Sequence, residues 1–321
     1  MDKEDLALLG PALESFLAEF ADVAITPTRK LIAAYLRGQL GPLPRKSVMP
    51  MAREAGIAPR TLQELLSLHR WDEELMIDTL QRHVWRARGG TDTVATILES
   101  CCPKKGTRTP GVDLQRCGPA GRTRNCVVLL HLGFSDGDFN CLLDNAIYLP
   151  KSWTDSPERR DAARIPPGVK HRTKSQIALD LLDRAASNGH RFGWVTCGIE
   201  YASDAQFLKD LDGRGYRYVA PRPALGEGER SFGAAGPWIT NADGAGTAET
   251  VLRVARAGED NLGAFEQRRK EIGLDHFEVR SYRSLLRHLA LSSASLLFLE
   301  ERVKKASASR KERSAIKSRA L

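Results

Sequence analysis

The order of apolar and polar residues predicts a helical first part of the chain. Residues 5–20 place apolar side chains three and four positions apart, which is the spacing of one face of an amphipathic helix. Further helices are predicted over residues 28–39 and from Asp72 onward, where two acidic residues suit a helix N-terminus. Between them, residues 51–65 have the spacing of a helix-turn-helix, with Gly56 at the turn.

The pattern changes from helical to β at the pair Gly89-Gly90. Short apolar runs predict strands at residues 94–98, 127–132, 139–149, 192–196 and 216–220. Apolar residues at helical spacing predict helices at residues 175–187, 204–211, 247–272 and 281–303, and residues 221–247 read as a loop. Strands that alternate with helices in this way indicate an α/β fold with a mixed sheet.

The formal net charge of +8 belongs mostly to the C-terminal end of the chain. Residues 302–321 contain eight Lys or Arg and one acid, which gives +7, so the other 301 residues carry about +1. A basic tail of this kind predicts salt-sensitive binding to a polyanion such as DNA. The alternative is a solvated terminus that has no partner.

The chain has no feature of a membrane or secreted protein. Its longest apolar run, residues 285–299, is interrupted by Arg287 and His288 and is too short to span a bilayer. The acidic opening after Met1 is unlike a secretory leader. We therefore expect a cytoplasmic protein, without a membrane partner, whose six cysteines are reduced.

Several common motifs do not occur in the sequence or do not fit their surroundings. The phrase from Gly133 to Gly137 matches the G-x-S-x-G pattern of a nucleophilic serine, but strands are predicted on both sides, so we interpret it as a hairpin turn. No C-x-x-C pair occurs, and the seven histidines lack the spacing of metal ligands. The sequence also has no phosphate-binding loop and no dinucleotide fingerprint.

Unusual local phrases follow one another along the chain and point to a known family. They are Tyr35-Leu36-Arg37-Gly38, Arg60-Thr61-Leu62-Gln63, Pro103-Lys104-Lys105-Gly106, Gly118-Pro119-Ala120-Gly121-Arg122 before Asn125-Cys126, Tyr148-Leu149-Pro150-Lys151-Ser152-Trp153, Arg172-Thr173-Lys174 and Gly273 to Ser281. In this order they resemble the transposases of the insertion-sequence 701 type, a branch of the bacterial DDE transposases. The resemblance runs from about Thr28 to about Phe298.

The resemblance implies a catalytic domain folded like ribonuclease H, with a five-strand mixed sheet flanked by helices. Together with the periodicity, it predicts three parts. Residues 1–90 form an all-α N-terminal region with the helix-turn-helix-like segment, residues 91–303 form the ribonuclease-H-like domain with a shortened insertion, and residues 304–321 form the basic tail.

The resemblance also implies three carboxylates that hold two magnesium ions, and each of the three positions holds another residue here. Leu98 stands at the first Asp, Gly198 at the second Asp and Leu262 at the Glu. None of these residues offers an oxygen ligand to a hard cation. We therefore expect the two-metal site to be lost, with no cofactor, and the chain not to act as a transposase or nuclease.

Acids and thiols close to these positions are candidates for a repurposed site. Glu99 is one residue past the first position, so on a strand it faces the opposite side. Glu200 could reach inward from its loop, and Glu266 lies one helical turn after Leu262 on the same face. Cys101, Cys102 and Cys197 flank the first two positions at the ends of neighbouring strands. They suggest a thiol or soft-metal site, and the alternative is that the cysteines are small apolar residues beside an inactive centre.

Two functions from different classes follow from the sequence. The first is a transposase-derived DNA-binding protein that lacks DDE catalysis. Its candidate phosphate contacts are Arg45, Lys46, Arg53, Arg60, Lys104, Lys105, Arg268, Arg269 and Lys270. The second is a recruited enzyme or accessory protein that acts on a small molecule in the old catalytic cleft. A decaying gene product is a third interpretation, and the oligomeric state is not predicted.

Overall fold

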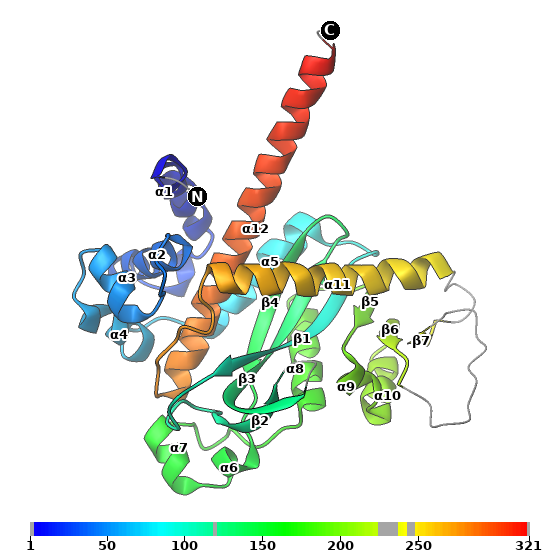
Figure 1. Ribbon diagram of the computed structural model, residues 1–321, viewed down its shortest axis with the longest axis horizontal. Helices are drawn as coiled ribbons and strands as arrows, with labels where there is room; N and C mark the ends of the chain where they lie inside the picture. The colour runs from blue at the N-terminus through cyan, green and yellow to red at the C-terminus, as the bar shows by residue number, and fades with distance from the viewer. Residues whose placement is uncertain (1–2, 118–120, 224–236, 243–247, 320–321) are drawn as a thin grey trace.

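The structure is a computed structural model that describes residues 3–117, 121–223, 237–242 and 248–319. It contains one seven-stranded sheet with helices on both faces (Figure 1). The strands are β1 (Val94–Pro103), β2 (Asp113–Cys117), β3 (Arg122–Ser135), β4 (Asn140–Ile147), β5 (Trp194–Thr196), β6 (Tyr218–Pro221) and β7 (Trp238–Thr240). The helices before the sheet are α1 (Lys3–Ala18), η1 (Ala21–Val23), α2 (Thr26–Leu40), α3 (Val48–Glu54), α4 (Pro59–Ser67) and α5 (Glu73–Arg88).

The remaining helices follow the first four strands or connect the later ones. They are α6 (Lys151–Thr154), α7 (Pro157–Ala163), α8 (Lys174–Ser187), α9 (Ile199–Ala202), α10 (Ala205–Gly213), α11 (Ala248–Glu271) and α12 (Tyr282–Arg319). The sheet order is β2-β3-β1-β5-β6-β7, and β4 pairs with β3 on the side where β2 also pairs. β1, β5 and β6 are parallel, whereas β3 is antiparallel to both β1 and β4. The core order β4-β3-β1-β5-β6 confirms the expected five-strand mixed sheet, and β2 and β7 extend it.

Two adjacent residues of β4 show which helices cover each face of the sheet. Because successive strand side chains point to opposite faces, Asp144 and Asn145 point toward different helical layers. Gln81 of α5 donates to the Asp144 carboxylate, and Arg184 of α8 lies 3.7 Å from it. On the other face, the Asn145 amide donates to Ser293 of α12. Thus α5 and α8 cover one face, and α11 and α12 cover the other (Figure 1).

The N-terminal helices pack on the same hydrophobic core as the sheet, and α12 connects them. Buried apolar residues of the N-terminal helices, the sheet and α12 form one large cluster, and a smaller second cluster lies between α11 and the strands β1, β5 and β6. The Tyr35 hydroxyl of α2 lies 2.8 Å from Nδ1 of His288, and the Gln39 amide donates to Ser292. The structure changes from helix to strand near residue 90. The division into parts at residues 1–90, 91–303 and 304–321 remains a prediction.

The segment predicted as a helix-turn-helix forms two helices joined by a tight turn. Gly56 in the turn has φ 64°, a left-handed conformation that disfavours residues with a Cβ atom. Ala52 of α3 is fully buried, as are Leu62 and Leu65 of α4. A Cβ atom on Gly38 of α2 would lie 2.7 Å from Cγ of Met51, so a glycine allows α2 and α3 to pack closely.

The structure departs from the sequence pattern at two places. β7 lies within the segment that we expected to be a loop, and it pairs antiparallel with β6. α12 continues without a break from the apolar run into the basic tail, and its last turns extend away from the other elements in Figure 1. Among the described residues, no helix is both long enough and apolar enough to cross a bilayer.

Candidate functional site

The three positions that the resemblance assigns to carboxylates lie at one end of the sheet and on the helix that crosses it. Thr96 of β1 pairs with Thr196 of β5, and Leu98 follows on the same face of β1. Gly198 lies two residues after the end of β5 and caps the N-terminus of α9. Leu262 lies on α11, four residues after Gly258. We refer to Leu98, Gly198 and Leu262 as the vacated positions.

The close packing of α11 on the sheet fixes the surroundings of the vacated positions. A Cβ atom on Gly258 would lie 2.7 Å from Cγ2 of Thr196, so the helix and β5 are almost in contact there. One turn later, the Asn261 amide donates to the carbonyl of Phe134 at 2.7 Å. Leu98 is 5% exposed beneath this helix, whereas Leu262 is 43% exposed at its side.

The acids closest to the vacated positions already have other partners, with one exception. Glu99 faces away from α11, as expected, where it accepts from the Tyr201 hydroxyl at 2.7 Å and pairs with Lys174 at 2.5 Å. Glu266 pairs with Arg269 of the same helix at 2.8 Å. Glu200 lies beside Gly198, since a Cβ atom there would be 2.8 Å from its Oε2. A Glu200 and Glu266 pair would therefore have to replace an existing ion pair.

The cysteines near the vacated positions do not all lie on one face of the sheet. Cys101 and Cys102 are adjacent on β1, so their side chains lie on opposite faces of the sheet. Burial raises the pKa of the Cys102 thiol to about 12, and burial beside Glu200 raises the pKa of Cys197 to about 12. Among the residues that the structure describes, no three His, Cys, Asp or Glu side chains are grouped so that they could hold a metal ion.

Four of the nine candidate phosphate contacts are used within the protein. The Lys46 ammonium is buried and donates to the carbonyls of Gln39 and Glu271. Lys104 donates to two backbone carbonyls at 2.9 and 2.8 Å, and its ammonium lies 3.4 Å from the ring centre of Phe277. Arg268 and Arg269 are mostly buried and pair with carboxylates. Each of these four side chains would have to leave its partners within the protein to contact a phosphate, and their role as phosphate contacts stays a prediction.

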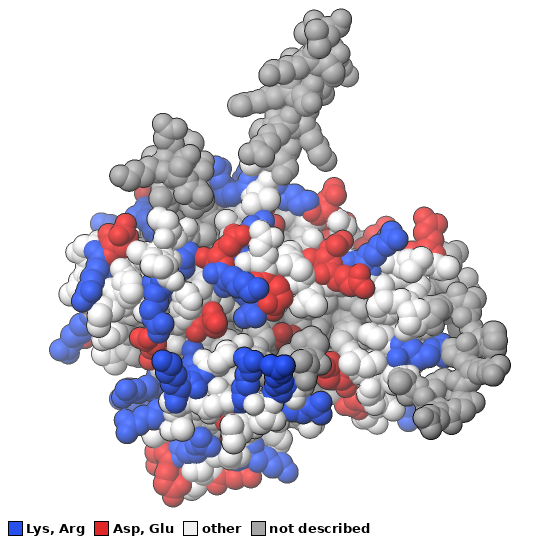
Figure 2. All heavy atoms as spheres, in the orientation of Figure 1, with Lys and Arg blue, Asp and Glu red and all other residues white. Residues whose placement is uncertain are grey.

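The other five candidates are exposed, and they are Arg45, Arg53, Arg60, Lys105 and Lys270. Arg45 pairs with Glu278, and Arg60 pairs with Glu64 on the same helix face. On the face drawn in Figure 2, basic and acidic side chains are interspersed, and the basic ones gather mainly on the side of α2 to α4, α6 and α7. On this face, the side that carries the helix-turn-helix therefore has the larger number of basic side chains.

A buried polar network on the α11 face was not expected from the sequence. Oγ of Ser100 lies 2.7 Å from Nε2 of His131, and Nδ1 of His131 lies 2.6 Å from Oδ1 of Asn145. The ring of Phe265 covers His131 at a centroid distance of 4.6 Å. Burial lowers the pKa of His131 to about 4, so the ring is neutral at physiological pH. The serine is 3% exposed, and we interpret this network as internal support of the sheet.

The sheet order and its two helical layers define a ribonuclease-H-like fold. The family model for DDE superfamily endonucleases matches residues 20–224, and the chain belongs to this family. The match ends before α11, where Leu262 lies.

A curated relative supports the same assignment. The chain is 26% identical over 186 residues to the probable transposase for insertion sequence element IS701 of Microchaete diplosiphon. This alignment covers 57% of the chain and 46% of the relative, so the chain spans about half the length of that protein. The similarity confirms the resemblance to transposases of this type.

Proposed function

We propose that this chain is a transposase-derived protein that has lost DDE catalysis and retains DNA binding. The observation that supports the first half is the identity of the three vacated positions. Two leucines and a glycine supply no side-chain oxygen in the middle of β1, after β5 and on α11. Mg²⁺ requires oxygen ligands, and in the DDE arrangement these come from carboxylates.

The surrounding residues do not fit the two-metal group either. The side chains that line this part of the sheet include Thr96 and Thr196, whose neutral hydroxyls are weak substitutes for carboxylates. Oγ1 of Thr96 is buried and has no hydrogen-bond partner among the described residues. Glu99 and Glu266 are held by Lys174 and Arg269 and would have to give up these partners.

The proposal of DNA binding rests on the family relationship, the helix-turn-helix and the basic end of α12. Arg53 and Arg60 extend from α3 and α4 into solvent, where a phosphate backbone has access to them. Residues 304–321 contain seven Lys or Arg and one acid. Since the rest of the chain is nearly neutral, most of the favourable electrostatic free energy of DNA binding would come from this end of the helix.

Truncating the chain after Val303 is expected to flatten the salt dependence of DNA binding. It removes seven basic residues, and at about 0.9 per phosphate contact the slope of log affinity against log salt should fall by several units. The last buried residue of α12 among the described ones is Glu300, so the fold should persist. The measurement is a fluorescence-anisotropy titration of a labelled duplex between low and moderate salt.

A full-length variant with Gln at the same seven positions is the control for this experiment. It keeps the helix length and removes only the charges, so it should show the same flattened slope. If both variants kept the slope of the parent protein, the basic end would not contact DNA. If the parent protein did not bind DNA at low salt, the retained DNA binding would be wrong.

A further inference from the structure

We propose that a cavity beside the helix-turn-helix binds a small amphipathic anion, which is a molecule with an apolar ring body and one carboxylate, sulfonate or phosphate group. The cavity has a volume of about 500 Å³. It lies between α3, α4, the end of α7 and the segment from Phe277 to Ser281. Its lining includes none of the vacated positions, so it is a site separate from the old catalytic cleft.

The size and the lining of the cavity fit the apolar part of such a ligand. Sites for small organic molecules usually have volumes of about 300–1,000 Å³ and mostly apolar walls. Leu66 and Phe277 form buried parts of the lining. Met49 and Leu68 line the same cavity although they are 49% and 64% exposed. A ring placed between these side chains would remove apolar surface from water.

The charged groups of the cavity favour an anion. Arg164 and Arg280 line it and are exposed, and the structure gives neither guanidinium an ion pair or a hydrogen bond within the described residues. The one acid of the lining, Glu278, is paired with Arg45. The cavity therefore presents two arginines without a bound carboxylate, and guanidinium groups bind carboxylates and phosphates with two parallel hydrogen bonds.

The backbone at Arg164 provides an independent reason to regard this arginine as functional. Arg164 has φ 53° and ψ 45°. Among the described residues, it is the one residue other than glycine with a positive φ. A left-handed residue at the end of a helix is usually glycine, and a side chain there costs about 1 kcal/mol. Arg164 lines the same cavity as the unpaired Arg280, and a strained backbone at such a residue is consistent with a role in ligand binding.

A small molecule fits this site better than a DNA phosphate. A duplex backbone follows a surface and makes polar contacts, whereas this cavity combines its two arginines with apolar side chains such as Leu66 and Phe277. The proposal is independent of DNA binding, because the cavity and its charges are properties of the described fold alone. The experiment below distinguishes a small anion at the two arginines from DNA at the same arginines.

The test uses the fluorescent anion 1-anilinonaphthalene-8-sulfonate and the full chain at constant ionic strength. We expect saturable binding with one site per chain. The Arg164→Gln and Arg280→Gln double variant should bind the probe at least about tenfold more weakly, since charge-assisted hydrogen bonds are the stronger kind. Leu68→Gln should weaken binding as well. Arg256→Gln changes an exposed arginine of α11 outside the lining and is the matched control, which should bind as the parent chain does.

Three results would overturn the proposal. Equal affinity of the parent chain and the double variant, both with the same thermal midpoint, would show that the arginines do not hold the anion. Equal affinity for the uncharged analogue N-phenyl-1-naphthylamine would show a merely hydrophobic surface. If a short duplex displaced the probe from the parent chain but not from the double variant, these arginines would belong to a DNA interface instead.

Discussion

Replacing Arg287 by Met is expected to reduce the free energy of unfolding by about 3–5 kcal/mol. Arg287 of α12 is 1% exposed, and its guanidinium donates to Glu73 at 3.0 Å, to the carbonyl of Leu65 at 3.2 Å and to the carbonyl of Trp71 at 2.9 Å. Methionine fills a similar volume but has no donor, so the partners lose these hydrogen bonds while they stay buried. The measurement is urea unfolding monitored by circular dichroism.

Arg283 provides the matched control for this prediction. It pairs with the same carboxylate, at 2.7 Å, but its side chain is 59% exposed. Because exposed ion pairs contribute about 0–1 kcal/mol, Arg283→Met should change stability by no more than that. Equal losses for the two variants would mean that burial of Arg287 does not determine its contribution, and the described attachment of α12 to α4 and α5 would be wrong.

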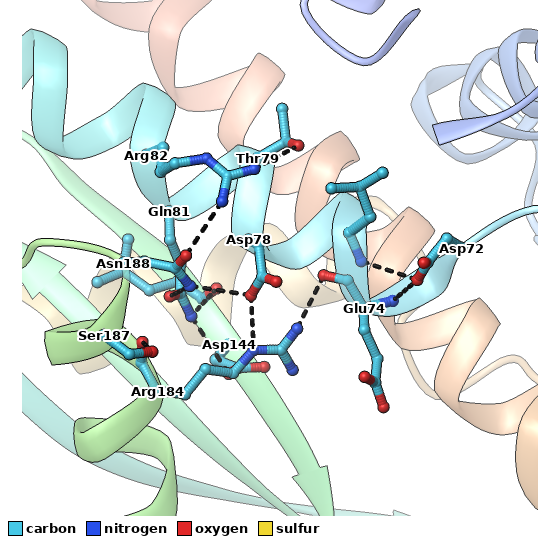
Figure 3. Close-up of polar contacts among 12 residues, drawn as sticks. Asp72, Glu74, Asp78, Thr79, Gln81, Arg82, Asp144, Arg184, Ser187 and Asn188 are labelled. Carbon is cyan, nitrogen blue, oxygen red and sulfur yellow. Dashed lines mark hydrogen bonds and ion pairs between the residues drawn. The ribbon is translucent and has the colours of Figure 1, made fainter. Parts of the chain in front are cut away.

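Asp144→Asn is expected to make the stability of the protein less dependent on pH. The Asp144 carboxylate is 2% exposed and lies among Gln81, Asp78 and Arg184 between α5 and α8 (Figure 3). Burial raises the pKa of Asp144 from 3.8 to about 6 in the folded protein, despite the nearby Arg184. Its protonated form therefore adds stability that is fully present below about pH 4 and lost as pH rises through about 6.

The difference between the variant and the parent protein gives the size of this effect. Since one pKa unit corresponds to about 1.4 kcal/mol, the parent should lose about 2 kcal/mol relative to Asp144→Asn between about pH 4.5 and about pH 7.5. Asp78→Asn, which removes a carboxylate 2.9 Å from Nε of the same arginine, is the control and should retain the pH dependence of Asp144. An unchanged difference across this range would contradict a raised pKa at Asp144.

The fold could be predicted from the sequence because each main element has a strong local signal. Asp72 begins α5 with its carboxylate accepting from the backbone amides of Glu74 and Leu75, as its position before two acids indicated. The apolar run of β3 and the Ser135 to Asp138 turn predicted the β3–β4 hairpin. β7 was missed because it has three residues and its pairing with β6 depends on tertiary contacts, which a local pattern does not contain.

The candidate site was less predictable because burial and pairing of charged residues are not visible in the sequence. In the sequence, Lys46 and Lys104 cannot be told from exposed lysines. The fold brings backbone carbonyls to their ammonium groups. Arg287 and His288 interrupted an apolar run, yet the structure buries both within the core. Arg164 and Arg280 are 116 positions apart in the chain, and the fold places both in the lining of one cavity. No spacing between residues in the sequence could have predicted this.

The most direct test of the central claim is a strand-cleavage assay with the purified full chain in Mg²⁺ and in Mn²⁺. The substrate is supercoiled plasmid, and nicked and linear products are measured. We expect no metal-dependent cleavage, because Leu98, Gly198 and Leu262 supply no oxygen ligands to a divalent ion. Glu200→Ala and Glu266→Ala, tested together, should leave this inactive result unchanged. Metal-dependent cleavage by the parent chain that this double variant abolishes would show a rebuilt catalytic site and would contradict the loss of catalysis.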